Sequence, residues 1–401
     1  MQSASTFPDL GVSEAVTRAL ADGGIRSPFP IQAMVIPDAL AGHDVLARSR
    51  TGSGKTLAFA VPIVERIDPA APQPSALILV PTRELCSQVT EEFSKICRAK
   101  GLRVAAVYGG VGMGPQASAA PRAHVLVATP GRMEDLANRR LVSLRGVRVL
   151  VLDEADRMLD MGFQPQVDRL VRRIPADRQT MFFSATLDGP VGRLAQNYTR
   201  GARRHEIESA KQTVEEVEHR FLPVQAHAKV EALVELLRTE TGPFLVFVRT
   251  KRGADRLAHK LKAQGVKAEA MHGDLSQAAR ERALARFESG RSTTLVATDV
   301  AARGLDLEAI SHVVNFDPPQ EDKDYVHRVG RTARAGRSGI GITFVSPDQE
   351  GDVSRMAHRL KLGEEFVQDG MKIAPPRVVY RSRTGRKSLL AGRTGRPARR
   401  F

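Results

Sequence analysis

The feature that most constrains the fold is a series of short apolar runs separated by longer segments with helical spacing. Each run is four to six residues long and is apolar at nearly every position. Strands buried on both faces of a parallel sheet have this pattern, whereas strands with one solvent-exposed face alternate apolar and polar residues. In the first half of the chain this pattern predicts strands at residues 44–47, 76–80, 104–108, 125–128, 147–152 and 180–183.

The second half of the chain repeats the pattern. It predicts strands at residues 244–248, 268–271, 294–297, 312–315 and 341–345. Between the strands of the first half, segments such as 57–67 and 84–99 have helical spacing. Two successive strand–helix alternations predict an α/β protein with two domains, each a mainly parallel sheet flanked by helices.

The seam between the domains is predicted in a polar stretch at residues 208–213. A last strand of the first domain is expected at 204–207, and a first strand of the second domain at 217–224. The domains are therefore placed at residues 1–207 and 214–370, with 208–213 as the linker.

The C-terminal residues 371–401 carry much of the charge. The chain has a formal net charge of +15, and this segment holds ten Lys and Arg residues and no Asp or Glu. It is rich in Gly, Pro and Ser, which predicts a disordered basic tail. Such a tail suits a polyanion such as nucleic acid, because neutralised phosphates release counterions. A tail that only increases solubility is the alternative.

The composition excludes several classes of protein. With 42% hydrophobic and 26% charged residues, the chain is neither collagen-like nor disordered overall. No segment approaches the ~20 apolar residues of a membrane helix, and the N-terminus lacks the features of a secretory signal. Only Cys86 and Cys97 are present, which argues against a disulfide framework or a zinc site. We therefore expect a cytoplasmic protein without a membrane partner.

A glycine-rich segment follows the strand expected at 44–47 and precedes an apolar helix. It reads Ser49-Arg50-Thr51-Gly52-Ser53-Gly54-Lys55-Thr56, which matches the phosphate-loop pattern G-x-x-x-x-G-K-[ST] except at Ser49. Glycines there allow backbone N–H groups to surround a phosphate, the Lys places a positive charge beside it, and the Thr hydroxyl can ligate Mg²⁺. A glycine-rich turn without a ligand is the alternative.

An acidic cluster, Asp153-Glu154-Ala155-Asp156, directly follows the strand expected at 147–152. In phosphate-loop enzymes an Asp at the end of a buried strand holds the metal ion. The adjacent Glu154 could orient and deprotonate an attacking water. The alternative is an ordinary helix N-terminus, where acidic residues are common.

Together these motifs resemble the DEAD-box family of ATP-dependent RNA helicases, since the acidic cluster continues as Arg157-Met158-Leu159-Asp160-Met161-Gly162-Phe163. Further motifs occur in the family's order, from Phe7 and the Q motif at 24–32 to segments at 81–85, 109–110, 129–132, 184–186, 247–250, 272–280, 297–306 and 327–334. The resemblance spans residues 7–345. It implies two tandem RecA-like domains, ATP and Mg²⁺ as cofactors, RNA as the partner, and a monomer.

Four positions depart from the family pattern. Phe29 stands where the family usually has Thr or Ser, which removes a hydroxyl from the nucleotide pocket. Ser49 and Cys86 replace a usual Ala, and Ala333 replaces a usual Gly.

The resemblance also assigns roles at the ATP site. Gln32 would hydrogen-bond adenine and Phe7 would stack on it, unless Phe7 only packs on the first helix. The phosphate loop (Ser49 to Thr56) would hold the triphosphate, and Thr56 and Asp153 would hold Mg²⁺. The remaining assignments are Glu154 as general base, Asp306 on the ribose, Arg331 and Arg334 as arginine fingers, and His327 as a link to the acidic motif. The alternative for the arginines is a basic helix face, with Arg328 and Arg337, directed at RNA.

The RNA contacts implied by the resemblance are Pro81, Thr82, Arg83, Gly110, Thr129, Arg132, Gly273, Arg280 and Thr298. Ser184, Thr186 and Asp156 would couple hydrolysis to RNA binding. Such groups suit phosphate and sugar rather than bases, so the expected activity is RNA-stimulated ATP hydrolysis with local, largely sequence-independent unwinding or RNP remodelling. An ATP-gated RNA clamp and a DNA translocase are the alternatives.

Overall fold

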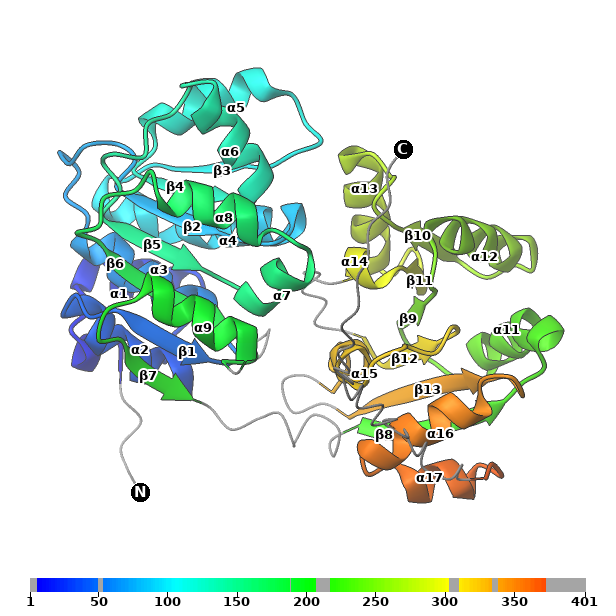
Figure 1. The fold of residues 1–401 in the computed structure, drawn as a ribbon. Helices are drawn as coiled ribbons and strands as arrows, with labels where there is room; N and C mark the ends of the chain where they lie inside the picture. Colours follow the sequence, from blue (N-terminus) through cyan, green and yellow to red (C-terminus); the bar gives the residue numbers. More distant parts are fainter. Residues whose placement is uncertain are drawn as a thin grey trace, which may run out of the picture.

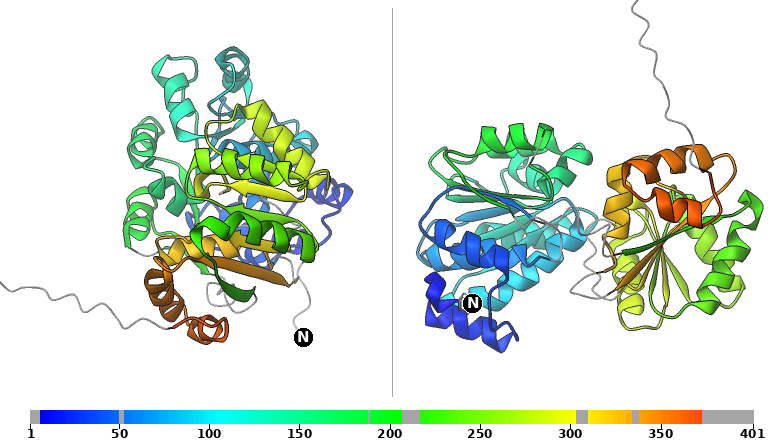
Figure 2. Two further views of the ribbon diagram at one scale, coloured as in Figure 1. Left: turned by 90° about the vertical axis from the view of Figure 1, so that its right-hand side faces the viewer. Right: turned by 90° about the horizontal axis from the view of Figure 1, so that it is seen from below.

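The computed structural model describes residues 6–49, 53–187, 189–206, 217–302, 310–333 and 338–372. These residues form two α/β domains that lie beside each other (Figures 1 and 2). Within them the paired strands are parallel throughout, as the apolar runs predict. The expected linker 208–213, and the basic tail from residue 373 onward, lie outside the described residues.

The first domain contains a sheet of seven described strands in the order β3-β4-β2-β5-β6-β1-β7. The strands are β1 (Val45–Arg48), β2 (Ala76–Leu79), β3 (Val104–Val107), β4 (Val125–Ala128), β5 (Val149–Leu152), β6 (Gln179–Ser184) and β7 (Arg203–Glu206). Their positions agree with the expected strands, with ends that differ by one or two residues.

Helices cover both faces of this sheet. In β2, alternate side chains point to opposite faces and pack in different buried clusters. Ala76 and Ile78 belong to one buried cluster, whereas Leu77 and Leu79 belong to the cluster on the other face. The first cluster includes α1 (Glu14–Asp22), α2 (Pro30–Leu40), α3 (Lys55–Arg66) and α4 (Arg83–Cys97). The second includes α5 (Met113–Ala119), α6 (Pro130–Asn138), α7 (Ala155–Asp160), α8 (Gln164–Val171) and α9 (Gly189–Tyr198).

The second domain contains six described strands in the order β10-β11-β9-β12-β13-β8. They are β8 (Val217–Pro223), β9 (Phe244–Phe247), β10 (Ala268–Met271), β11 (Thr294–Ala297), β12 (His312–Asn315) and β13 (Gly339–Val345). On one face lie α11 (Lys229–Thr239) and α12 (Lys251–Ala263). On the other lie α13 (Gln277–Glu288), α14 (Asp299–Ala302), α15 (Asp322–Val329), α16 (Glu350–Arg359) and α17 (Gly363–Gln368).

The folded part of the second domain extends slightly into the segment predicted as the tail. Met371 is buried in the cluster that also contains Val353 and Phe366. The backbone N–H of Lys372 donates to the carboxylate of Glu350 at 3.2 Å. Described structure therefore continues to the end of residue 372.

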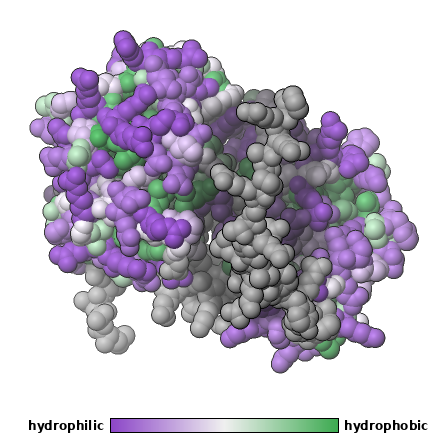
Figure 3. Space-filling model, in the orientation of Figure 1, coloured by the Kyte–Doolittle hydropathy of each residue, from purple (hydrophilic) through white to green (hydrophobic). Residues whose placement is uncertain are grey.

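Most of the molecular face in Figure 3 is polar, and apolar residues appear there only in small patches. None of the described helices is long and apolar enough to span a membrane.

Candidate nucleotide and nucleic-acid site

The end of the phosphate loop is shaped by Gly54. Its φ of 81° lies in the left-handed region that favours glycine, and it precedes the first residue of α3, Lys55. Lys55 is buried, and Ser53 and Thr56 are half-buried. Ser49, at the end of β1, donates its backbone N–H to the carbonyl of Ser184 at 3.0 Å. The predicted loop residues Arg50, Thr51 and Gly52 lie outside the described residues.

Asp153 faces the phosphate-loop lysine from the end of β5. The Lys55 Nζ lies 3.4 Å from the Asp153 Oδ1, and both side chains are buried. Burial disfavours the charged ammonium, but Asp153, Glu154 and Asp156 more than offset it, so the pKa of Lys55 is raised. Burial raises the pKa of Asp153 despite the opposing charge of Lys55. This carboxyl group thus lies in a site that favours an additional cation.

Glu154 is held beside arginine side chains. It adopts a left-handed backbone with φ 51° immediately before α7. Its Oε2 accepts a hydrogen bond from the Arg157 Nη1 at 2.6 Å. Burial opposes its ionisation, but the charges of Arg157, Lys55 and Arg331 prevail and lower the pKa of Glu154 to about 2. Glu154 is therefore a carboxylate at neutral pH, and its environment includes Arg331 of the second domain.

The helix α15 lies opposite α7 across the domain boundary. Lys323 of α15 reaches Asp160 of α7, with 3.3 Å between Nζ and Oδ1. His327 belongs to the same helix, which places it on the element that faces the acidic motif. Arg331 follows this helix and is buried. The predicted Asp306 and Arg334 lie outside the described residues.

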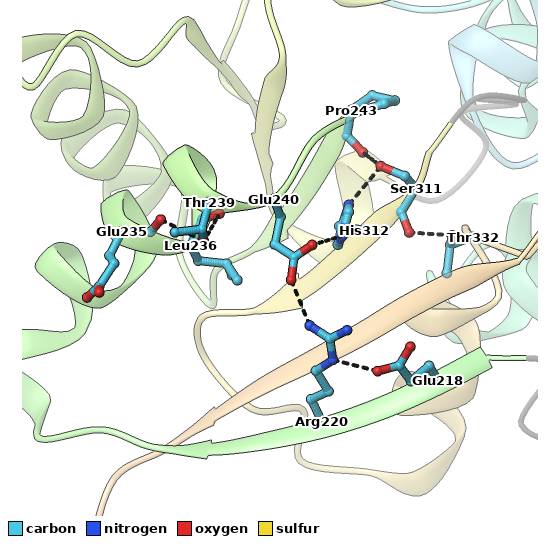
Figure 4. A network of polar contacts seen from close by, with 10 residues as sticks. All are labelled: Glu218, Arg220, Glu235, Leu236, Thr239, Glu240, Pro243, Ser311, His312 and Thr332. Carbon is cyan, nitrogen blue, oxygen red and sulfur yellow. Dashed lines mark hydrogen bonds and ion pairs between the residues drawn. The ribbon is translucent and has the colours of Figure 1, made fainter.

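A chain of polar contacts fixes the backbone beside Arg331 (Figure 4). Thr332 donates its hydroxyl to the carbonyls of Ile310 at 2.7 Å and Ser311 at 3.1 Å. The Ser311 hydroxyl is 2.8 Å from the Nδ1 of His312, whose ring stacks on Phe244. Burial lowers the pKa of His312, so this ring is neutral near pH 7. Thr332 is thereby tied to the entry of β12.

The three residues predicted to couple hydrolysis to RNA binding are close to one another. The Ser184 Oγ accepts backbone N–H groups from Asp156 at 3.4 Å and Thr186 at 3.3 Å. The Asp156 carboxylate accepts the N–H of Ala185 at 3.2 Å. The end of the acidic motif and the segment after β6 therefore form one hydrogen-bonded unit.

The predicted adenine-reading residues have different surroundings. Gln32 is fully buried: its Oε1 accepts the Phe29 N–H at 2.9 Å, and its Nε2 donates to the Gly54 carbonyl at 2.8 Å. Phe7 is only 1% exposed and belongs to a core cluster that includes α1. The burial of Phe7 favours the alternative in which this ring packs on the first helix.

The residues predicted to contact RNA in the first domain lie after strand ends. Pro81 is buried, and Thr82 and Thr129 are the residues that precede α4 and α6. Arg83 lies so close to Gly110 that a Cβ on this glycine would be 1.8 Å from the Arg83 Nη1. Arg132 donates from Nη1 and Nη2 to the Val111 carbonyl, each at 3.2 Å. The two arginines are thus positioned by the glycine segment that follows β3.

In the second domain, Gly273 and Thr298 line a groove of about 1070 Å³. The groove also contains four cationic residues that the sequence prediction omitted, namely Arg249, Lys251, Arg252 and Arg256. Their signal was present in the sequence, because Arg249 lies just before the α12 segment and the other three lie in its first two turns. Lys251 is paired with Asp274, with 2.6 Å between Nζ and Oδ1.

Two arginines have positions that the sequence did not indicate. Arg280 is predicted to contact RNA, but its Nε lies 2.6 Å from the Oε1 of Glu84 in the other domain. Both side chains of this pair are buried. Arg280 also donates to the carbonyl of His272 at 3.2 Å. Its guanidinium therefore occupies a contact between the domains.

Arg328 is one member of the alternative basic helix face. It is only 4% exposed, its guanidinium forms two bonds to Asp299 at 2.6 and 2.7 Å, and it lies over the Phe247 ring. It also donates to the Asn315 side chain at 3.0 Å and the Asp317 carbonyl at 2.7 Å. The buried position of Arg328 does not support a face directed at RNA.

The chain matches two protein-family models. The DEAD/DEAH box helicase model matches residues 29–194, and the helicase conserved C-terminal domain model matches residues 228–336. The DEAD-box ATP-dependent RNA helicase CshA of Bacillus licheniformis is 43% identical over 347 residues, which cover 86% of this chain and 71% of the relative.

Solved structures also resemble this chain across both domains. Dbp5 of S. cerevisiae, bound to RNA and ADP BeF3, is 32% identical and matches with a TM-score of 0.80, over 90% of this chain and 94% of that chain. Mss116p, bound to ssRNA and AMP-PNP, is 27% identical with a TM-score of 0.78, over 90% and 78% of the two chains. Both alignments span the two domains of this chain.

Proposed function

Because the chain belongs to the DEAD-box family of ATP-dependent RNA helicases, we propose that ATP hydrolysis between its two domains drives local unwinding of RNA. The observation that carries this proposal is the charge arrangement at the domain boundary. Glu154 of the first domain lies within the electrostatic reach of Arg331 of the second. A hydrolytic site that draws residues from both domains works only when the domains are together.

At the nucleotide, the residues of this chain bind and orient the phosphates. Lys55 and the start of α3 place positive charge at the phosphate site. The donor set formed by the Thr56 hydroxyl and the buried Asp153 carboxylate fits Mg²⁺, which prefers oxygen ligands and keeps contacts to substrate phosphates. When bound, Mg²⁺ supplies charge neutralisation for the β- and γ-phosphates. The raised pKa of Asp153 supports this assignment, because a nearby cation would relieve the cost of its buried charge.

Glu154 orients the attacking water and accepts its proton, while Arg331 stabilises the charge that develops on the γ-phosphate. A correctly placed arginine finger contributes about 10³–10⁵ in rate. By family resemblance Arg334 adds a second finger, Asp306 binds the ribose, Gln32 reads adenine as the family's Q motif does, and His327 links this region to the acidic motif.

RNA binds along the ends of the strands in both domains. Backbone amides and threonine hydroxyls there suit sugar and phosphate groups. The basic groove of the second domain adds Arg249, Arg252 and Arg256. Hydrogen bonds join Asp156 of the acidic motif to Ser184 and the segment after β6, and by family resemblance this unit with Thr186 would couple the nucleotide site to the RNA surface. RNA binding and nucleotide hydrolysis would thereby depend on each other.

We further propose that the protein acts as a monomer in the cytoplasm. Cys86 and Cys97 are buried free thiols, and burial raises the pKa of each to about 12. Such thiols suit a reducing compartment.

The decisive experiment compares the ATPase rate of the full chain without nucleic acid, with single-stranded RNA, and with DNA of the same sequence. We expect strong stimulation by RNA only. Equal rates with and without RNA would contradict the proposal, and equal stimulation by DNA would indicate a translocase. Unwinding of a short RNA duplex is measured in parallel, since long residence on RNA without strand separation would identify a clamp.

A further inference from the structure

The edge strand β3 of the first domain borders a groove that the proposed function does not use. Among the described strands β3 pairs only with β4, and it lies at the top of this sheet in Figure 1. Val104, Ala105 and Ala106 of β3 are half-buried, whereas every residue of β4 is buried. Val104 and Ala105 line a groove of about 530 Å³. The edge of the sheet is therefore accessible from this groove.

The outer side of β3 presents backbone hydrogen-bonding groups. The Arg103 carbonyl accepts a hydrogen bond from the Val125 N–H at 3.1 Å, on the side of β4. Because the backbone groups of a parallel strand alternate between its two sides, those of Val104 and Ala106 face away from β4. No described strand pairs with that side. Such an edge is a template for one more strand.

Arginines from both faces of the sheet surround the groove. Arg98 follows α4, which packs on one face, and Arg122 follows α5, which packs on the other. Arg103 precedes β3, and it donates from Nε to the Arg122 carbonyl at 2.7 Å and from Nη2 to Gln73 at 3.2 Å. All three arginines are exposed, and no Asp or Glu is among the described residues that line the groove. The groove is therefore positively charged.

The floor of the groove is apolar, and the groove is displaced from the proposed RNA surface. Leu102 and Ala123 line it and are buried. Leu102 and Arg103 precede β3, whereas Gly110 of the proposed RNA surface follows this strand. The charge of the groove is thus not accounted for by the RNA contacts.

The geometry and the charge favour an acidic peptide over other occupants. A peptide strand offers both N–H donors and carbonyl acceptors to the edge of β3, whereas the phosphates of a nucleic acid offer acceptors only. A second copy of this chain would bring the same three arginines to the interface, and like charges that face each other are unfavourable. The chain's own residues 371–401 hold ten basic residues and no acidic ones.

We propose that the edge of β3 is a docking site for an acidic, extended segment of another protein, which adds to the sheet as a further strand. Alternate side chains of an added strand point to opposite faces of the sheet. Carboxylates on neighbouring residues of the segment would therefore approach Arg98 on one face and Arg122 on the other. The nucleotide site and the RNA surface stay accessible while this segment is bound.

The test measures binding of a fluorescent peptide, Glu-Glu-Val-Val-Glu-Glu-Val-Val, to the full-length protein by fluorescence anisotropy. We expect saturable binding that the double variant Arg98→Ala with Arg122→Ala weakens about tenfold or more, because two charge-assisted contacts are lost. The matched control, Arg139→Ala with Arg169→Ala, removes two exposed arginines elsewhere on the first domain and should bind the peptide as the wild type does. RNA-stimulated ATP hydrolysis should be equal in all three proteins.

A second peptide separates strand pairing from charge. The same sequence N-methylated at every residue keeps all its carboxylates, and therefore any attraction to basic residues elsewhere in the chain. It cannot donate backbone hydrogen bonds to β3, so we expect its affinity for the wild type to be about tenfold weaker or less measurable still.

Several outcomes would overturn the inference. Absence of saturable peptide binding, equal affinity of the double variant and the wild type, or equal affinity of the two peptides would each do so. Loss of affinity for single-stranded RNA in the double variant, with peptide affinity retained, would assign the groove to the RNA surface. Dimerisation of the wild type in sedimentation experiments, strengthened by removal of the two arginines, would assign the edge to a second copy of the chain.

Discussion

At the residue scale, the ionisation of Glu154 depends on the arginine that it contacts. The hydrogen bond from Arg157 and the charges of Lys55 and Arg331 lower the pKa of this buried carboxyl to about 2. A base with this pKa remains deprotonated throughout the range in which the protein is assayed. The wild-type rate at saturating ATP and RNA should therefore show no acid limb caused by Glu154.

Arg157→Gln is predicted to create such a limb. Without the guanidinium, the largest charge that opposes burial is lost while Lys55 and Arg331 remain, so the pKa of Glu154 rises. The base is then lost as the pH falls through the raised pKa, so turnover should decline at acidic pH values where the wild-type rate stays constant. Measuring the rate at saturating ATP between pH 5 and 8 checks this, in a range set by the reference pKa values.

Arg157→Lys retains the charge and should keep the flat profile of the wild type. Arg169→Gln removes an exposed arginine that is paired with Glu134, and it serves as the control. A flat profile in a folded Arg157→Gln protein would contradict the assigned role of Glu154 as the base.

At the element scale, α4 and α13 meet through one buried ion pair between domains. The Arg280 Nε lies 2.6 Å from the Glu84 Oε1. Removing one partner of a buried pair costs about 3 kcal/mol, because it leaves an uncompensated charge. Glu84→Ala and Arg280→Ala should each lower RNA-stimulated turnover by roughly tenfold or more, an effect within that free energy.

The exchange Glu84→Arg with Arg280→Glu should recover part of the loss in RNA-stimulated turnover, because it restores opposite charges. Glu91→Ala changes an exposed residue of the same helix and should act as the wild type. If the exchange is no better than either single variant, the ion pair does not hold the domains together.

The first turns of α12 place exposed, positively charged side chains along the basic groove of the second domain. Arg252 and Arg256 are exposed and line it. Replacing both with Ala should weaken RNA binding and reduce the slope of log affinity against log salt by about one for each phosphate that is no longer neutralised. Arg18→Ala on α1, an exposed arginine outside the groove, is the control in salt titrations. An unchanged slope would exclude these two residues from the RNA path.

The sequence predicted the elements better than it predicted their contacts. The strand β4 was expected at 125–128 and observed there, because both of its faces are buried and its run is wholly apolar. Local spacing also identified the loop of Lys55 and the acid Asp153 that faces it. It could not identify the partner of Arg280, because Glu84 is 196 residues away and the pair exists only after two domains fold. Spacing also left open whether Phe7 is exposed.

At the scale of the whole molecule, the basic tail is predicted to act as an auxiliary RNA tether. The described fold ends with buried Met371 and the bonded N–H of Lys372, so truncation after Lys372 leaves these contacts intact. Removing residues 373–401 deletes nine Lys and Arg residues. This change should weaken RNA binding at low salt and flatten its salt dependence, while turnover at saturating RNA remains similar.

The matched control for this truncation replaces the nine basic residues by Gln at full length, which preserves length and removes charge. Both proteins should show the same reduced salt slope in an RNA titration. A wild-type slope after truncation would leave the tail with a role in solubility alone.

The contacts of Arg328 determine how α15 would move during the proposed ATPase cycle. Arg328 joins α15 to α14 through Asp299, to β12 through Asn315 and to β9 through the Phe247 ring. These contacts hold α15 against the sheet from several directions. We therefore expect α15 and Arg331, which follows it, to move together with the second domain. In the proposed cycle, a rotation of the second domain would therefore move Arg331 with it.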